Sequence, residues 1–418
     1  MPHGRQPLGL AGGATAGNNA GMNYGLLGID AQILQVVDAA RNRGDAVVIG
    51  CDLPASLPGP LAGMRRADSW QALLDATSCD AVIVGRADWN ATRAEAVRTL
   101  VQAGRTLLLA QPLELSMLWA YELDMIRQDT GARLVPLLTA RLHPFVRRLR
   151  AAIEAGLAGS GPLGPLESIG LVRRMPTRTR ETVLARLAAD ADLVRVLAGD
   201  PARLATLGAI DPDAAWSTLA VGFSGPDLVP TRWQVAPGDS PALAITLQHA
   251  RGTIEVEAAD DPTLPWTWSG PPVERLAFDT AAGLLDRLAG GEAGDGVPTA
   301  TWADAARAVE LAETVPRSLA KGRAIDLHRE EFSELGTFRG TMASLGCAIV
   351  LAGLLVLVAA TLIGGIANEL DPQRWGIVKT VAMRIADAWP TVVLVALGAF
   401  LALQLLPFLV GPDRPRDS

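Results

Sequence analysis

The stretch CDAVIVGRADWNATRAEAVRTLVQAGRTLLLAQPLELS, residues 79–116, decides the fold of this 418-residue chain. Two of its short uncharged runs, Ala81–Val84 and Thr106–Leu109, have the length and apolar character of strands buried on both faces. Between them Arg93–Ala103 has the pattern of a helix and stops at Gly104. A strand, a helix and a second strand in this order predict parallel strands joined by a helical crossover.

The same alternation extends in both directions from this stretch. Helices are expected after Asp30, around Trp70–Asp75 and from Ser116, as a cap, to Gly131. The remaining strands are expected at Asn23–Ile29, Ala46–Cys51 and Leu134–Val135. Together these elements predict a Rossmann-like domain over residues 22–140, an α/β doubly wound parallel sheet.

The pattern changes after Gly164. Two long helices are expected, at Glu181–Leu197 and Trp302–Ala320. Strand-like runs follow one another with few helices between them, at Leu166–Val172, Arg203–Gly208, Trp216–Phe223, Thr231–Val235, Ala242–Gln248 and Gly252–Ala258. Residues 141–335 are therefore predicted to form an α+β domain with a mostly antiparallel open sheet. Such a sheet commonly provides a cleft wall and a dimer surface, so we expect a homo-oligomer.

Composition excludes several classes of protein. The net charge of −7 offers no basic surface to nucleic acid. The three cysteines, Cys51, Cys79 and Cys347, form no CxxC pair, which argues against a disulfide framework and indicates reducing surroundings. The four histidines share no metal-ligand spacing. We therefore expect neither a nucleic-acid partner nor a metal.

Two long uncharged runs near the C-terminus predict a membrane anchor. Hydrophobic residues make up 49% of the sequence and concentrate here. Leu345–Ile366 and Pro390–Val410 each reach the ~20 apolar residues that cross a bilayer core. A pair of buried core helices is the alternative, but uncharged runs of this length seldom stay soluble. Residues 340–412 are expected to form a two-helix transmembrane hairpin in contact with membrane lipid.

Basic residues set the expected orientation of this hairpin. Five lie outside it and three lie in its connecting loop: Arg323, Arg329, Arg339, Arg414 and Arg416 outside, and Arg374, Lys379 and Arg384 in the loop. The positive-inside tendency then places the body in the cytoplasm. Residues 1–21 lack an apolar signal core and are expected to be a disordered leader.

The order and spacing of several motifs over about residues 22–330 resemble the Gfo/Idh/MocA family, named after glucose–fructose oxidoreductase, inositol dehydrogenase and a rhizopine-catabolism protein. The motifs are LLGID (26–30), VVIGCD (47–52), the stretch 79–116, RLHP (141–144), AAIEAG (151–156), ADADLVRVLAGDP (189–201) and SLAKGRAIDL (318–327). The resemblance implies NAD or NADP in the first domain. It also implies a sugar-like or polyol ligand over the sheet of the second.

The turn after the first strand departs from the dinucleotide-binding fingerprint. That fingerprint needs glycines where the backbone approaches pyrophosphate at a helix N-terminus. Gly28 keeps the first glycine, but Asp30 and Ile33 occupy the second and third positions. Asp30 can cap the following helix, and its carboxylate would then occupy the anion site itself. Asp52, at the end of the second strand, is placed to accept the ribose hydroxyls.

The positions that the resemblance implies for hydride transfer are also changed. The family's Glu-Lys-Pro corresponds to Ala110–Pro112 (AQP), and Gln111 cannot exchange a proton near neutral pH. The family's Asp and His on one helix of the second domain correspond to Ala185 and Ala189, while a further Asp is kept as Asp192. Asp192 is thus the substrate-side candidate, and no catalytic residue is assigned. The candidate cofactor-binding residues are Gly28, Asp30, Asp52, Gln111 and Pro112.

Two functions stay open at this point. One is a membrane-anchored relative of these oxidoreductases that is catalytically degenerate, binds NAD(P) weakly or not at all, and acts by ligand binding or assembly. The other is an active NAD(P)-dependent dehydrogenase or reductase of a sugar-like or polyol substrate with an atypical site. The combined loss of the lysine, the histidine, the paired aspartate and two glycines favours the first.

Overall fold

The computed structural model of the chain describes residues 21–327, apart from 57, 58, 62, 76, 209–213, 227, 262, 271 and 291–296, and also residues 358, 359 and 362. Two compact units divide the chain, Met1–Leu327 and His328–Ser418. The predicted leader, except for Gly21, and the predicted hairpin, except for those three isolated residues, lie outside the described residues. No helix among the described residues is long and apolar enough to span a membrane.

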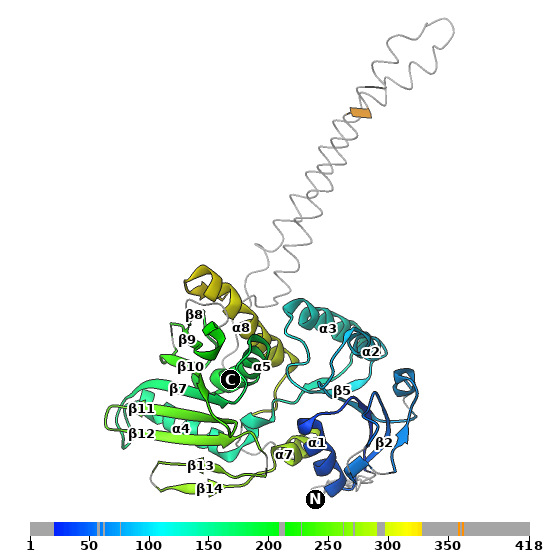
Figure 1. Cartoon of the computed structure of the whole chain (residues 1–418), viewed down its shortest axis with the longest axis horizontal. Coiled ribbons are helices and arrows are strands. Elements are labelled where there is room, and N and C mark those ends of the chain that lie inside the picture. The colour runs from blue at the N-terminus through cyan, green and yellow to red at the C-terminus, as the bar shows by residue number, and fades with distance from the viewer. Residues whose placement is uncertain are drawn as a thin grey trace, which may run out of the picture. The chain divides into compact units, whose positions relative to one another are not determined.

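A six-stranded parallel sheet with the order β3-β2-β1-β4-β5-β6 forms the first half of unit one (Figure 1). Its strands are β1 (Asn23–Leu27), β2 (Ala46–Cys51), β3 (Arg65–Arg66), β4 (Ala81–Val84), β5 (Thr106–Leu109) and β6 (Leu134–Pro136). The central strands are almost wholly buried because helices cover both faces of the sheet. The strand order reverses at β1, where doubly wound sheets bind their ligands. The predicted Rossmann-like sheet is confirmed.

The helices of this half begin at caps that the sequence offers. α1 (Ala31–Asn42), α2 (Ala91–Gln102) and α3 (Met117–Thr130) follow cap residues that each accept a backbone hydrogen bond from three residues further on: Asp30, Asn90 and Ser116. α3 ends at Gly131, whose φ of +70° favours glycine. The expected helix around Trp70–Asp75 is instead a short 3₁₀ helix, η2 (Trp70–Leu73). Only Leu73 of that helix is buried, and a single buried residue gives too narrow an apolar face for an α-helix.

A nine-stranded sheet forms the second half, in the order β14-β13-β12-β11-β7-β10-β9-β8-β15. Its strands are β7 (Leu166–Met175), β8 (Arg203–Leu207), β9 (Ala220–Ser224), β10 (Thr231–Pro237), β11 (Ala242–His249), β12 (Gly252–Ala259), β13 (Trp266–Trp268), β14 (Glu274–Leu276) and β15 (Ile325–Asp326). β10 and β7 are parallel, and the other described pairs are antiparallel. The sheet is therefore mixed and mostly antiparallel. Trp216, predicted in a strand, lies in the short helix α6 (Ala214–Ser217), so β9 starts later than predicted.

Helices join the two halves into one unit. A short 3₁₀ helix, η3 (Thr139–Leu142), and α4 (Pro144–Leu157) follow β6, while α5 (Arg180–Ala198) packs on α8 (Trp302–Lys321). α7 (Thr280–Leu288) packs against α1 of the first half. Trp302 is buried in the core of the first half and donates its indole N–H to the Ala120 carbonyl at 3.0 Å. Trp302, from the C-terminal part of unit one, thus completes the hydrophobic core of the first half.

Candidate functional site

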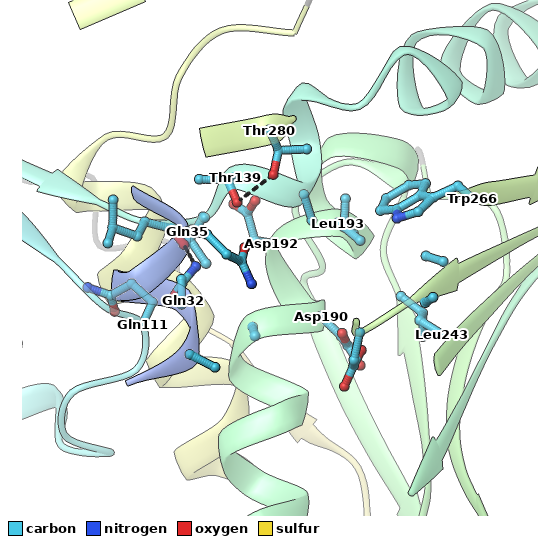
Figure 2. Close-up of a pocket in the computed structure, with 18 of the residues that line it drawn as sticks. Gln32, Gln35, Gln111, Thr139, Asp190, Asp192, Leu193, Leu243, Trp266 and Thr280 are labelled. Carbon is cyan, nitrogen blue, oxygen red and sulfur yellow. Dashed lines mark hydrogen bonds between the residues drawn. The ribbon is translucent and has the colours of Figure 1, made fainter. Parts of the chain in front are cut away.

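A cavity of about 620 Å³ lies where residues of the two halves meet. Its lining comes from α1, the turns after β4, β5 and β6, η3, β7, α5, β11, β12, the β13–β14 hairpin and the start of α7 (Figure 2). The first half therefore contributes the carboxyl ends of its strands next to the switch point, where ligands of doubly wound sheets lie. Asp30, Gln111 and Asp192, three of the predicted site residues, line this one cavity.

The N-terminus of α1 is occupied by a side chain of the protein. Asp30 caps the helix, as predicted: its Oδ1 accepts from the Ile33 backbone N–H at 2.9 Å. Its Oδ2 accepts from the backbone N–H of Arg86, which follows β4, at 2.8 Å. Gly28 adopts a φ of +70°, and a Cβ there would lie 2.6 Å from the Arg93 guanidinium. A carboxylate of the protein therefore occupies the anion-binding position at this helix N-terminus.

The Asp52 carboxylate is bound by Arg93 of α2. It follows β2 with a positive φ of 55°, and its Oδ2 accepts from Arg93 Nε at 2.7 Å and from Arg93 Nη2. The Arg93 side chain is buried and also donates to the carbonyls of Gly85 and Ala87. The Asp52 side chain is still 50% exposed. The predicted ribose acceptor is thus partly engaged in an internal ion pair.

Gln111 lines the cavity and has an unsatisfied side-chain amide. A cis peptide bond joins it to Pro112, and the residue is only 9% exposed. Its Nε2 is buried and has no hydrogen-bond partner among the described residues. Figure 2 places the side chain on the α1 side of the cavity. A buried amide donor needs an acceptor, which a ligand can supply, but it carries neither charge nor an exchangeable proton.

Asp192 is the centre of a buried ionic network. It is 1% exposed, and both of its oxygens accept from the Arg141 guanidinium of η3, one from Nε at 2.9 Å. Burial raises the pKa of Asp192. Asp304 of α8 lies 3.3 Å from Arg141 and 2.9 Å from Arg195. Although burial raises the pKa of Asp304, hydrogen bonds from Thr301 and the two arginines lower it overall.

The positions implied for a catalytic base carry no titratable group. Ala189 lines the cavity one turn before Asp192, while Ala185 is absent from the lining. His143 caps α4 through Nδ1, which accepts from the Phe145 N–H at 3.2 Å. Burial lowers the pKa of His143 from 6.5 to about 4, so it is neutral at pH 7. Among the described residues no group of three His, Cys, Asp or Glu could hold a metal ion.

A cluster of charges in the cavity escaped the sequence interpretation. Arg173 of β7 binds Asp190 of α5 and Asp260, which follows β12, while the Trp233 indole donates to Asp190 at 2.9 Å. Arg86 and Arg186 line the cavity beside this group. Arg86 lies two residues after β4 in the deciding stretch, and that position at a strand's carboxyl end is a signal that could have identified it. The partners of Arg173 are distant in sequence and give no such signal.

Solved structures with the same fold are available for comparison. A myo-inositol dehydrogenase from Corynebacterium glutamicum matches at 15% identity and a TM-score of 0.55, over 73% of this chain and 99% of that one. An oxidoreductase from Agrobacterium radiobacter in complex with NAD+, L-tartaric acid and magnesium matches at 17% and 0.55, over 73% and 98%. The WlbA dehydrogenase from Bordetella pertussis in complex with NADH and UDP-GlcNAcA matches at 17% and 0.55, over 74% and 98%. The fold is that of the Gfo/Idh/MocA oxidoreductases.

At these identities the likeness is one of fold. No family model matches the sequence, and no curated protein matches it. Two of these three neighbours hold a nicotinamide dinucleotide, NAD+ in the Agrobacterium oxidoreductase and NADH in the WlbA dehydrogenase.

Proposed function

We propose that this protein is a membrane-anchored member of the oxidoreductase fold that no longer transfers hydride and works by binding a small ligand in its cavity. The observation that carries the proposal is the Asp30 carboxylate at the N-terminus of α1, with both oxygens bonded to backbone N–H groups. This position is where a dinucleotide would place its pyrophosphate. The protein itself supplies the negative charge.

The negative charge of Asp30 is expected to weaken the binding of a dinucleotide phosphate substantially. A carboxylate about 5 Å from a phosphate charge raises the energy by about 3 kcal/mol at an effective dielectric constant near 20. An increase of about 3 kcal/mol weakens binding by roughly a hundredfold. Gln111 adds to the effect because it brings no positive charge to the other end of the groove. We expect NAD(P) to bind with a dissociation constant no better than millimolar.

The substrate side of the cavity supports the same proposal. Proton transfer needs a group whose pKa lies near the working pH and which can reach the ligand. Ala189 provides no such group, and Asp192 has both oxygens committed to Arg141. The cavity nevertheless keeps polar donors, of which Gln111 lacks an acceptor. A protein that retains the groove and lacks the proton acceptor is suited to binding a ligand without reacting with it.

The membrane part of the proposal rests on sequence. The uncharged runs Leu345–Ile366 and Pro390–Val410 are long enough to span a bilayer, and the distribution of basic residues favours a cytoplasmic body. The open second sheet of each body would then be free to assemble with another copy. The ligand class implied by the fold is sugar-like.

The test is a titration of the full chain with NADH and NADPH, followed by nicotinamide fluorescence. Two variants are compared with the unaltered protein: Asp30→Ser, which keeps an N-cap acceptor without charge, and the double variant Asp30→Ser/Gln111→Lys. We expect affinity to improve at least tenfold in the double variant without turnover of inositol or glucose. Micromolar affinity in the unaltered protein, or oxidation of a polyol or sugar, would instead establish the active dehydrogenase.

A further inference from the structure

Arg86 lines the cavity, and its guanidinium has no partner among the residues that the structure describes. The residue follows β4, and its backbone N–H is bound to Asp30, so its position is fixed independently of its side chain. The side chain is partly buried and lines the cavity. It makes no hydrogen bond or ion pair with any residue that the structure describes. Five N–H donors on a rigid fork are therefore available to a ligand.

No described carboxylate is bonded to that guanidinium, although Asp30 and Asp260 lie near it. Burial and the nearby Arg186 of α5 lower the pKa of Arg86, although Asp30 and Asp260 act in the opposite direction. The Asp30 oxygens are taken by two backbone N–H groups. Asp260 is taken by Arg173 and by Arg186, whose Nη2 lies 3.1 Å from Asp260 Oδ2. Both arginines therefore line the cavity, and of the two only Arg186 is bonded to a carboxylate among the described residues.

The other wall of the cavity is aromatic and apolar. Trp266 is stacked on His143 with ring centroids 4.0 Å apart and 15° between the planes, which fixes its orientation. Phe278 and Leu264 line the same wall and are 41% and 53% exposed, unusually open for large apolar side chains. Figure 2 shows Trp266 and Leu243 on the side of the cavity opposite Gln111.

We propose that the cavity binds a small ring-bearing carboxylic acid, with its carboxylate between Arg86 and Arg186 and its ring against Trp266 and Phe278. The guanidinium fork matches a carboxylate in two parallel hydrogen bonds. A singly charged group is favoured over a phosphate dianion because Asp30, Asp190 and Asp260 also line the cavity. The inference rests on the proposed binding function and names the chemical class of its ligand.

The experiment is calorimetric titration of the full chain with two matched pairs of probes. D-glucuronate is compared with D-glucose, and benzoate with benzyl alcohol, so that each pair differs in its carboxylate; inorganic phosphate serves as the dianion. We expect one acid to bind at least tenfold more tightly than its neutral partner and than phosphate. The acid that binds identifies the ring as that of a sugar or as aromatic. Equal binding within both pairs, or binding of neither acid at millimolar concentration, would overturn the inference.

Variants of Arg86 supply the second measurement. Arg86→Gln should weaken the bound acid at least tenfold and Arg86→Lys less, because lysine keeps the charge without the fork. Without ligand, Arg86→Gln should raise the melting temperature by about 2 °C, since a partly buried charge beside Arg186 is removed. Arg232→Gln, at an exposed position of β10 outside the cavity lining, is the matched control and should change neither quantity. Unchanged acid binding in Arg86→Gln would contradict the inference.

The same samples separate this inference from the proposed function. If neither acid binds and NADH does not bind either, the inference that the ligand is a carboxylic acid is wrong, but the proposed loss of cofactor binding is still supported. Micromolar NADH binding that Arg86→Gln abolishes would assign Arg86 to the cofactor and contradict both.

Discussion

Replacing Asp192 by alanine should destabilise the protein far more than replacing a surface aspartate. Asp192 and Arg141 are 1% and 4% exposed, and the carboxylate takes two hydrogen bonds from the guanidinium. Removing one partner of a buried ion pair leaves an uncompensated charge and costs about 3–5 kcal/mol. Asp304, 3.3 Å from Arg141, remains and limits the loss, so we expect about 3 kcal/mol. Urea unfolding of the full chain, followed by tryptophan fluorescence, measures this loss in the free energy of unfolding.

Two further variants make this measurement decisive. Asp286→Ala removes an exposed partner of Arg43, 3.4 Å away, and should cost less than about 1 kcal/mol. The double variant Arg141→Met/Asp192→Leu removes both charges and should recover much of the loss, because an apolar pair of similar size can replace a buried ion pair. If Asp192→Ala is no more destabilising than Asp286→Ala, Asp192 is not a structural ion-pair residue. Its earlier assignment as a substrate-side acid would then regain support.

Three other predictions concern pH, anchoring and orientation. The folded-state pKa of His143 is lowered from 6.5 to about 4, so the unfolded chain binds more protons in that range and stability is lost as pH falls through it. Melting temperatures of His143→Asn, which keeps an acceptor for the Phe145 N–H, should depend less on pH there; an unchanged pH profile would refute this. The full chain should fractionate with membranes and resist carbonate extraction, whereas recovery in the soluble fraction without detergent would rule out the anchor at residues 340–412. A reporter fused to Ser418 that is active only in the periplasm should stay silent, and activity would reverse the orientation.

Local signals in the sequence predicted much of the fold. Buried runs such as Ala81–Val84, and caps such as Ser116, depend on residues within a few positions, so both are recognisable without tertiary information. The short strands β3 and β14 were missed because two or three residues give no readable alternation and depend on their pairing partners. Trp216 was assigned to a strand because of its apolar neighbours, yet its segment forms one helical turn.

In the candidate site, too, the local features could be predicted from the sequence and the long-range pairs could not. The cap formed by Asp30 spans three residues and follows from its position before a helix. The second bond of Asp30, to the Arg86 backbone, spans 56 residues, and the Arg93–Asp52 pair spans 41. Arg141 and Asp192 are 51 residues apart. Such pairs exist only because the topology brings separate elements together, so the sequence could mark the individual residues but not the pairs.

The most direct test of the degenerate cofactor site is the stabilisation of the unaltered full chain by NADPH and by NADH. A ligand that binds the folded state raises the unfolding free energy according to its concentration relative to its dissociation constant. With about 1 mM dinucleotide and a dissociation constant of about 1 mM or weaker, the increase is at most about 0.4 kcal/mol. We predict an increase within that limit for both dinucleotides. An increase of about 2.7 kcal/mol, which corresponds to a dissociation constant near 10 μM, would show that Asp30 does not keep the cofactor out.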